Sequence, residues 1–134
     1  PLHELGHWLG YRSVGIEASI EWFPRGNSFA RTVPNIDSNE TFTKWEQNRI
    51  LISAAGGLCA FLILFIPALL IDPLVTAVPL VHLGLAILEP IYSPAFVLGY
   101  GDPYFTLAAS VAAFIMGFSL ALNLDHLMRR LREN

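Results

Sequence analysis

The first seven residues hold two histidines and a glutamate at the spacing of a zinc-binding helix. His3-Glu4-Leu5-Gly6-His7 has the pattern H-E-x-x-H. In an α-helix, residues four apart lie one turn apart on the same face, so His3 and His7 can bind one metal ion. Glu4 lies about 100° round the helix from His3, beside the ligand pair. We therefore expect one Zn²⁺ ion, with Glu4 as the general base that takes a proton from a zinc-bound water.

The alternative is a surface helix on which two histidines occur by chance. The glutamate between them and the apolar residues that follow, Trp8-Leu9-Gly10, favour metal chemistry.

The composition is that of a membrane protein with one domain. Of the 134 residues, 54% are apolar and 14% are charged, against about 25% charged in soluble domains. A net charge of −3 gives no basic surface for nucleic acid, so we expect none as a partner. Cys59 is the single cysteine, which excludes an intrachain disulfide, and in an apolar run it is expected to pack.

Three apolar segments predict membrane helices. Residues 50–71 and 104–124 carry no charge, and each run is long enough to cross a hydrocarbon core of about 30 Å. Residues 73–88 are apolar over a shorter length and include His82. Arg129, Arg130 and Arg132 follow the last run, so the C-terminus is expected to be cytoplasmic.

The predicted fold is a mainly α, multi-pass membrane domain over residues 1–134. Alternation of apolar and polar residues at 16–22 indicates a strand, and the turn signal at 24–27 predicts a β-hairpin. Residues 34–43 are expected to be a polar loop, and Trp45 an interfacial aromatic residue. The expected elements are a helix at 1–12, a hairpin at 14–33, and membrane helices at 48–72, 74–90 and 103–126.

Three further features concern the start of the chain, the packing of its helices and the segment before the last helix. The chain opens two residues before the histidine motif and without an initiator Met, so we expect it to be truncated at its N-terminus. Small residues at 53–57 predict close packing against another helix. Residues 91–102, broken by proline and glycine, are expected to form a loop or non-helical backbone that lines a polar cavity.

A catalytic zinc usually takes a third protein ligand, and several acidic residues are candidates. Asp102, which lies between glycine and proline, ranks first and is also a candidate helix N-cap. Glu89 ranks second, and His82 is a further candidate. The two are spaced for one face of a helix, where the pair could orient a ligand, or His82 could simply form a hydrogen bond across helices. Asp125 ranks third, because it is spaced to pair with Arg129. Less favoured ligands are Asp72 and His126.

Together these motifs resemble the site-two protease family of intramembrane zinc metalloproteases. The H-E-x-x-H motif is followed by a hairpin-like stretch, as in that family. Residues 52–58 are similar to the small-residue patch that opens the family's next membrane helix, with Gly57 where proline is usual. Gly101-Asp102-Pro103 stands where the family has a Leu-Asp-Gly element, and Asn123-Leu124-Asp125 is an alternative match one span later.

The resemblance implies a zinc metalloendopeptidase that hydrolyses peptide bonds of membrane-embedded substrates in the plane of the bilayer. His3, His7 and Asp102 would then hold the zinc, with Glu4 as base and later as general acid. The hairpin would hold the unwound substrate as an added strand. Two other functions stay open: a non-proteolytic membrane protein that binds or transports zinc, and a non-enzymatic membrane scaffold. The sequence does not predict the oligomeric state.

Overall fold

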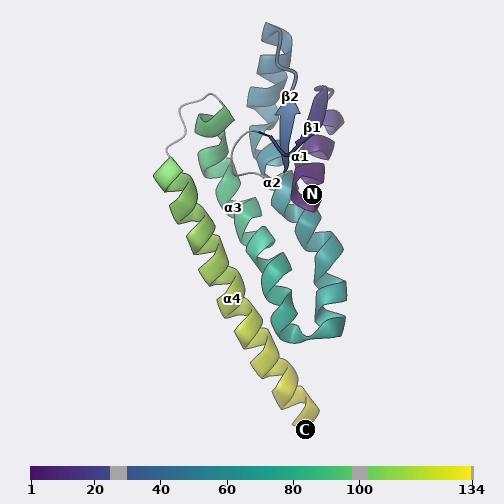
Figure 1. Cartoon of the computed structure of the whole chain (residues 1–134), viewed down its shortest axis with the longest axis vertical. Coiled ribbons are helices and arrows are strands. Elements are labelled where there is room, and N and C mark those ends of the chain that lie inside the picture. The colour runs from purple at the N-terminus through teal and green to yellow at the C-terminus, as the bar shows by residue number, and fades with distance from the viewer. Residues whose placement is uncertain (25–29, 98–102, 134) are drawn as a thin grey trace.

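The chain folds into four α-helices and one β-hairpin (Figure 1). The computed structural model describes residues 1–24, 30–97 and 103–133, with side chains described outside 92–97 and 103–106. The mainly helical fold and the short hairpin confirm the expectation from the sequence. In chain order the elements are α1 (Leu2–Ser13), β1 (Ala18–Trp22), β2 (Ala30–Pro34), α2 (Asn39–Ile71), the 3₁₀ helix η1 (Pro73–Thr76), α3 (Ala77–Val97) and α4 (Pro103–Glu133).

Helix α2 packs against α3, and α3 packs against α4 (Figure 1). Helix α1 packs on α2, and both strands of the hairpin contact α1. α2 and α3 are joined by the short η1 turn and therefore run antiparallel. α4 runs back along α3, so its C-terminus lies at the end of the molecule opposite to the hairpin (Figure 1). As a result, α1 lies against α2, and the hairpin lies against α1.

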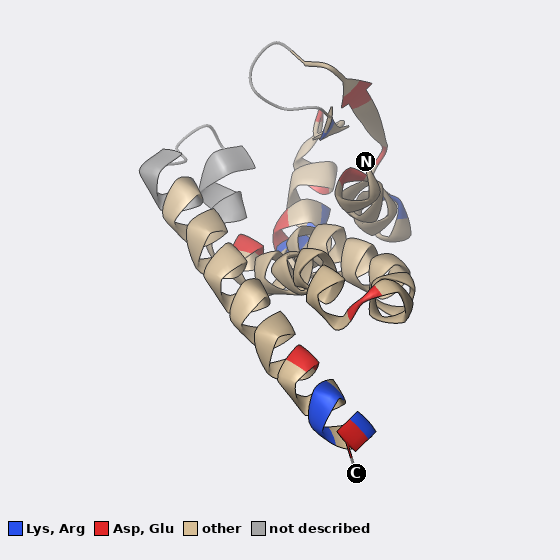
Figure 2. Ribbon diagram, turned by 60° about the horizontal axis from the view of Figure 1, so that its bottom comes forward, with Lys and Arg blue, Asp and Glu red and all other residues tan. Residues whose placement is uncertain are grey.

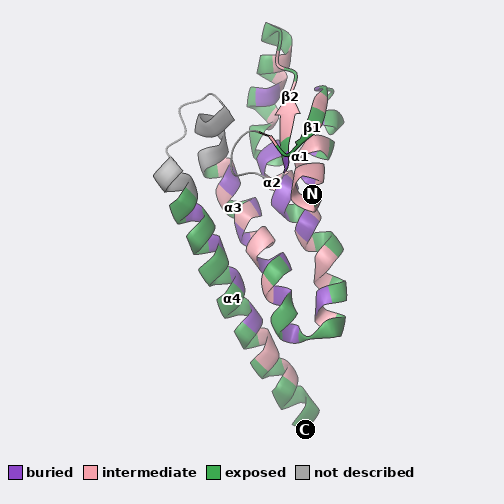
Figure 3. Cartoon of the chain, in the orientation of Figure 1, coloured by how far each residue is buried: buried purple, intermediate pink, exposed green. Residues whose placement is uncertain are grey.

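Among the described residues, three helical segments are long and apolar enough to cross a membrane: Asn39–Ile71, Pro73–Ile91 and Leu107–Glu133. Their outward faces carry exposed leucine, isoleucine and phenylalanine side chains (Figure 3). Lysine and arginine are almost absent from α3 and most of α4, and arginines gather at the C-terminal end of α4 (Figure 2). These features are compatible with a membrane protein.

α2 begins earlier than the sequence suggested, because a capping box starts it at Asn39 within the expected loop. Ser38 Oγ accepts a hydrogen bond from the Thr41 amide at 3.2 Å, and Thr41 Oγ1 accepts one from the Ser38 amide at 3.1 Å. These two bonds satisfy backbone donors that a helix start leaves unpaired. Trp45, expected at a membrane interface, is instead buried in a small core with Tyr11, Ile16 and Ile52.

α3 and α4 also run further than expected. α3 passes through Pro90 and ends at Val97, although a helix end was expected at 90. A proline removes one backbone hydrogen bond, but in apolar surroundings the remaining peptide groups are still best satisfied by a helix. α4 continues past 126 to Glu133, and Asp125 pairs with Arg129 one turn on, at 3.0 Å.

The hairpin places one face of its two strands on α1. β1 and β2 are antiparallel, with Ile20 opposite Thr32. The Trp8 indole N–H donates to the Ala18 carbonyl at 2.9 Å, and Thr32 bonds to Glu4, so this face contacts α1. The strand expected at 16–22 is confirmed over Ala18–Trp22. The alternation of burial holds from Ala18 to Glu21, whereas Trp22, expected on the apolar face, is exposed. The expected turn at 24–27 lies largely outside the described residues.

Candidate metal centre

Small residues allow α1 to pack closely against α2. A side chain at Gly6 would overlap the backbone carbonyl of Ala55, and one at Gly10 would lie 3.2 Å from the Cα of Ile52. The backbones of the two helices therefore approach each other over one face of α1. The small-residue run at 53–57, expected to pack against another helix, does so here.

Gly56 of α2 makes room for the ring of His7. A Cβ at Gly56 would overlap Nε2, Cε1 and Cδ2 of that ring. On the other side of the ring, Nδ1 lies 2.9 Å from the carbonyl oxygen of Ile52. A carbonyl accepts only, so Nδ1 carries the proton and Nε2 presents a lone pair, which is the tautomer that a metal needs.

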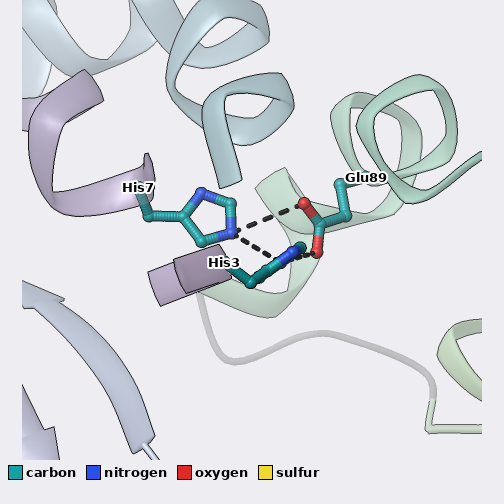
Figure 4. A group of neighbouring side chains, drawn as sticks. All are labelled: His3, His7 and Glu89. Atoms are coloured by element: carbon teal, nitrogen blue, oxygen red, sulfur yellow. Dashed lines mark hydrogen bonds and ion pairs between the residues drawn. The ribbon is translucent and has the colours of Figure 1, made fainter. Parts of the chain in front are cut away.

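Glu89 of α3 completes a group of three converging side chains (Figure 4). The Nε2 atoms of His3 and His7 are 3.1 Å apart. Glu89 Oε1 lies 2.8 Å from His3 Nε2, and Glu89 Oε2 lies 3.4 Å from His7 Nε2. α3 reaches this position because Gly57 lets its backbone approach α2: a Cβ there would overlap His82 O and Ala86 N.

These separations suit a tetrahedral ion. Zinc bonds of about 2.0–2.1 Å to nitrogen and oxygen place neighbouring ligand atoms about 3.3 Å apart in a tetrahedron. The three distances between donor atoms, 2.8, 3.1 and 3.4 Å, lie around this value. Two histidines and one glutamate are a known ligand set of catalytic zinc, with the fourth position left for water. The donor set therefore fits zinc.

The three ligands are largely shielded from solvent. The exposed fractions of the His3, His7 and Glu89 side chains are 17%, 16% and 12%. Burial by itself lowers the pKa of His7, but the hydrogen bond and charge of Glu89 outweigh it, helped by Ile52 and Glu4, and the pKa is raised. A proton and a metal ion compete for His7 Nε2. A bound cation would replace that proton, so metal affinity falls as the pH is lowered.

Glu4 points from α1 toward the hairpin rather than toward His3, His7 and Glu89, which together are called the ligand group. Its Oε2 accepts a hydrogen bond from the Thr32 amide at 2.6 Å and lies 2.9 Å from the Thr32 hydroxyl. The same hydroxyl is 2.8 Å from the Glu4 carbonyl oxygen. One turn of α1 thus offers two imidazoles on one side and a carboxylate, held by β2, beside them.

His82 adjoins the ligand group without belonging to it. Its ring centroid lies 5.5 Å from that of His3, with the rings tilted by 35°. The Nδ1 atoms of His3 and His82 are both buried and have no hydrogen-bond partner within the described residues. His82 and Glu89 lie on the same side of α3, as their spacing predicts.

The other candidate ligands that the structure describes lie elsewhere. Asp125 is bonded to Arg129 near the C-terminal end of α4, as its spacing predicted. Asp72 caps η1, where its Oδ1 accepts from the Leu74 amide at 2.7 Å. His126 is exposed on the same turn of α4 as Asp125. Asp102, the first-ranked ligand, lies outside the described residues.

The sequence placed Glu89 second among the candidates for the third zinc ligand, because Pro90 suggested a helix end at the membrane interface. Its sequence signal was a carboxylate in an otherwise uncharged apolar segment, which is costly unless it has a function.

Comparison of the chain with protein-family models, with curated proteins and with solved structures gives no match.

Replacement of Glu89 tests the ligand group directly. We expect Glu89→Gln to weaken zinc binding by more than about 100-fold, because loss of a direct ligand exceeds the 10–100-fold cost of losing an outer partner. Zinc content of detergent-purified protein, titrated against a competing chelator, measures this. Asp125→Asn is the matched control and should bind zinc normally. Zinc retained in Glu89→Gln but lost in Asp102→Ala would contradict this assignment.

Replacement of Gly56 tests the seating of His7. In Gly56→Ala the new methyl group must displace the His7 ring, so we expect zinc affinity to fall at least about tenfold, as when an orienting contact is lost. The control is Gly10→Ala, whose methyl group meets only the Ala55 side chain and the Ile52 backbone at 3.2 Å. Equal zinc affinities in the two variants would argue against this role of Gly56.

Proposed function

We propose that this chain is an intramembrane zinc metalloprotease that hydrolyses peptide bonds of membrane-embedded proteins. One observation carries the proposal: two histidines of the H-E-x-x-H motif and a carboxylate from a distant apolar helix converge within 4.8 Å, with Glu4 beside them. A helix that merely packs has no use for this combination of buried polar groups, which are costly in an apolar environment.

His3, His7 and Glu89 would hold the ion. A zinc ion bound there supplies a Lewis acid that polarises the scissile carbonyl and lowers the pKa of water toward 7. The Ile52 carbonyl keeps His7 in the required tautomer, and Gly56 fixes the plane of its ring. The protein thus prepares the ligand geometry before the metal arrives, which limits the reorganisation that binding requires.

Glu4 is the proposed general base. Its Oε2 is held by Thr32, so the carboxylate is fixed on the side of the ligand group that faces the hairpin. There it takes a proton from the attacking water and then gives it to the leaving amine as general acid. The attacking oxygen forms the new bond to the carbonyl carbon, and the C–N bond breaks as the amine receives the proton.

The apolar helices support a site inside the bilayer. Gly56 lies six residues after Ile50, where the uncharged run begins, which corresponds to a depth of about 9 Å along α2. At that depth a substrate helix must unwind before its amides can be attacked, because helical peptide groups are already hydrogen-bonded. The β-hairpin beside Glu4 offers strand backbone with which an unwound segment can pair.

The arginines of α4 support an orientation. Arg129, Arg130 and Arg132 follow the last apolar run, which favours a cytoplasmic C-terminus. Because the hairpin and ligand group lie toward the opposite end of α4 (Figure 1), the site then opens toward the other face of the membrane.

Replacement of the proposed base separates proteolysis from zinc binding alone. We expect Glu4→Gln to keep zinc but to lower cleavage of a membrane-embedded substrate by at least about 100-fold, the usual contribution of general base catalysis. Cleavage is measured on a library of single-span reporter proteins in proteoliposomes, and zinc by metal analysis. Glu17→Gln, on the loop before β1, is the control and should cleave normally.

Two outcomes would favour other functions. Bound zinc with no cleavage by the unmodified protein, or the same cleavage in Glu4→Gln, would favour a membrane protein that binds or transports zinc. Absence of stoichiometric zinc from the unmodified protein would favour a scaffold.

A further inference from the structure

The pairing of the hairpin defines which backbone groups point outward from it. The Asn35 amide donates to the Glu17 carbonyl at 2.7 Å, so these two residues form a hydrogen-bonded pair. In an antiparallel ladder such pairs alternate with pairs whose N–H and C=O groups point away from the partner strand. With the observed register, Ile20 and Thr32 form an outward-pointing pair.

On β2 the outward-pointing positions are Ala30, Thr32 and Pro34. Proline has no N–H to donate, so Thr32 provides the central outward donor of this edge. That donor is already engaged: the Thr32 N–H is bonded to Glu4 Oε2 at 2.6 Å. The edge of β2 nearest to the ligand group is therefore covered by the carboxylate of the proposed base.

We propose that Glu4 and the substrate backbone compete for the Thr32 N–H. This inference rests on the proposed function. An extended substrate segment adds to the outer edge of β2 and takes this N–H, which displaces the Glu4 carboxylate from it. The Thr32 hydroxyl has one proton and lies 2.8 Å from the Glu4 carbonyl and 2.9 Å from Oε2, so it keeps Glu4 close to the strand after the exchange.

The exchange ties the base to the arrival of substrate. In the free protein, the Thr32 N–H occupies Glu4 Oε2 through a hydrogen bond of 2.6 Å. Substrate pairing removes this bond at the place where the peptide enters. Glu4 becomes fully available as a base only when an extended backbone lies along β2, so water is activated when there is an amide to attack.

A binding experiment on metal-free protein tests this competition without any catalysis. The probe is a fluorescein-labelled eight-residue peptide of alternating valine and threonine, titrated by anisotropy in detergent with EDTA. We expect Glu4→Ala to bind it about tenfold more tightly than the unmodified protein, because a charge-assisted competitor worth at least about 1.5 kcal/mol is removed. The same peptide with alternate amides N-methylated should lose this gain.

Matched variants locate the strand edge. Thr32→Pro removes the outward donor without breaking a bond to β1, and in the Glu4→Ala background it should abolish the tighter binding. Ile20→Pro makes the same change on the outer edge of β1, opposite Thr32, and should leave binding unchanged. Glu17→Ala removes a nearby negative charge and should also leave it unchanged.

Three results would overturn the proposal: unchanged affinity in Glu4→Ala, equal tightening in Glu17→Ala, or loss of binding in Ile20→Pro in place of Thr32→Pro. None of these results would change the expected zinc content of the protein or the expected loss of cleavage in Glu4→Gln. Failure of the competition and failure of the protease assignment are therefore distinguishable.

Discussion

The ligand group depends on how closely α1 and α3 approach α2 at two consecutive glycines. Gly56 accepts the ring of His7, and Gly57 accepts the backbone of α3 near His82 and Ala86. Both contacts require the absence of a side chain, and both are set by adjacent residues of one helix. The position of His7 relative to Glu89 is thus set by one segment of α2 rather than by loops, and this brings donor atoms from two distant helices, α1 and α3, close together.

Much of the fold follows from short-range patterns in the sequence. Uncharged runs predicted the long apolar helices, and alternation predicted β1, because both signals reflect which faces of an element are apolar. The ends of the helices were harder to predict. The Ser38–Thr41 capping box, a local signal within an apparent loop, began α2 early. Pro90 did not end α3, because in apolar surroundings the remaining peptide groups are best satisfied by continued helix.

The sequence predicted only the grouping of those candidate site residues that lie together on α1. His3, Glu4 and His7 follow from helical spacing alone. The approach of Glu89 depends on how α3 packs against α2, and no spacing within the sequence encodes a contact between residues 86 positions apart. The hydrogen bond between Glu4 and Thr32 was missed for the same reason, since it depends on how the hairpin folds back on α1.

The length of α2 has a consequence for the supply of water. Its 33 residues span about 50 Å, whereas the hydrocarbon core is about 30 Å thick. Because the uncharged run starts at Ile50, the preceding turns, which carry Glu40, Lys44 and Arg49, form a polar stalk that would stand outside the hydrocarbon. For the proposed hydrolysis, this stalk would offer water a route toward the histidines that does not pass through lipid.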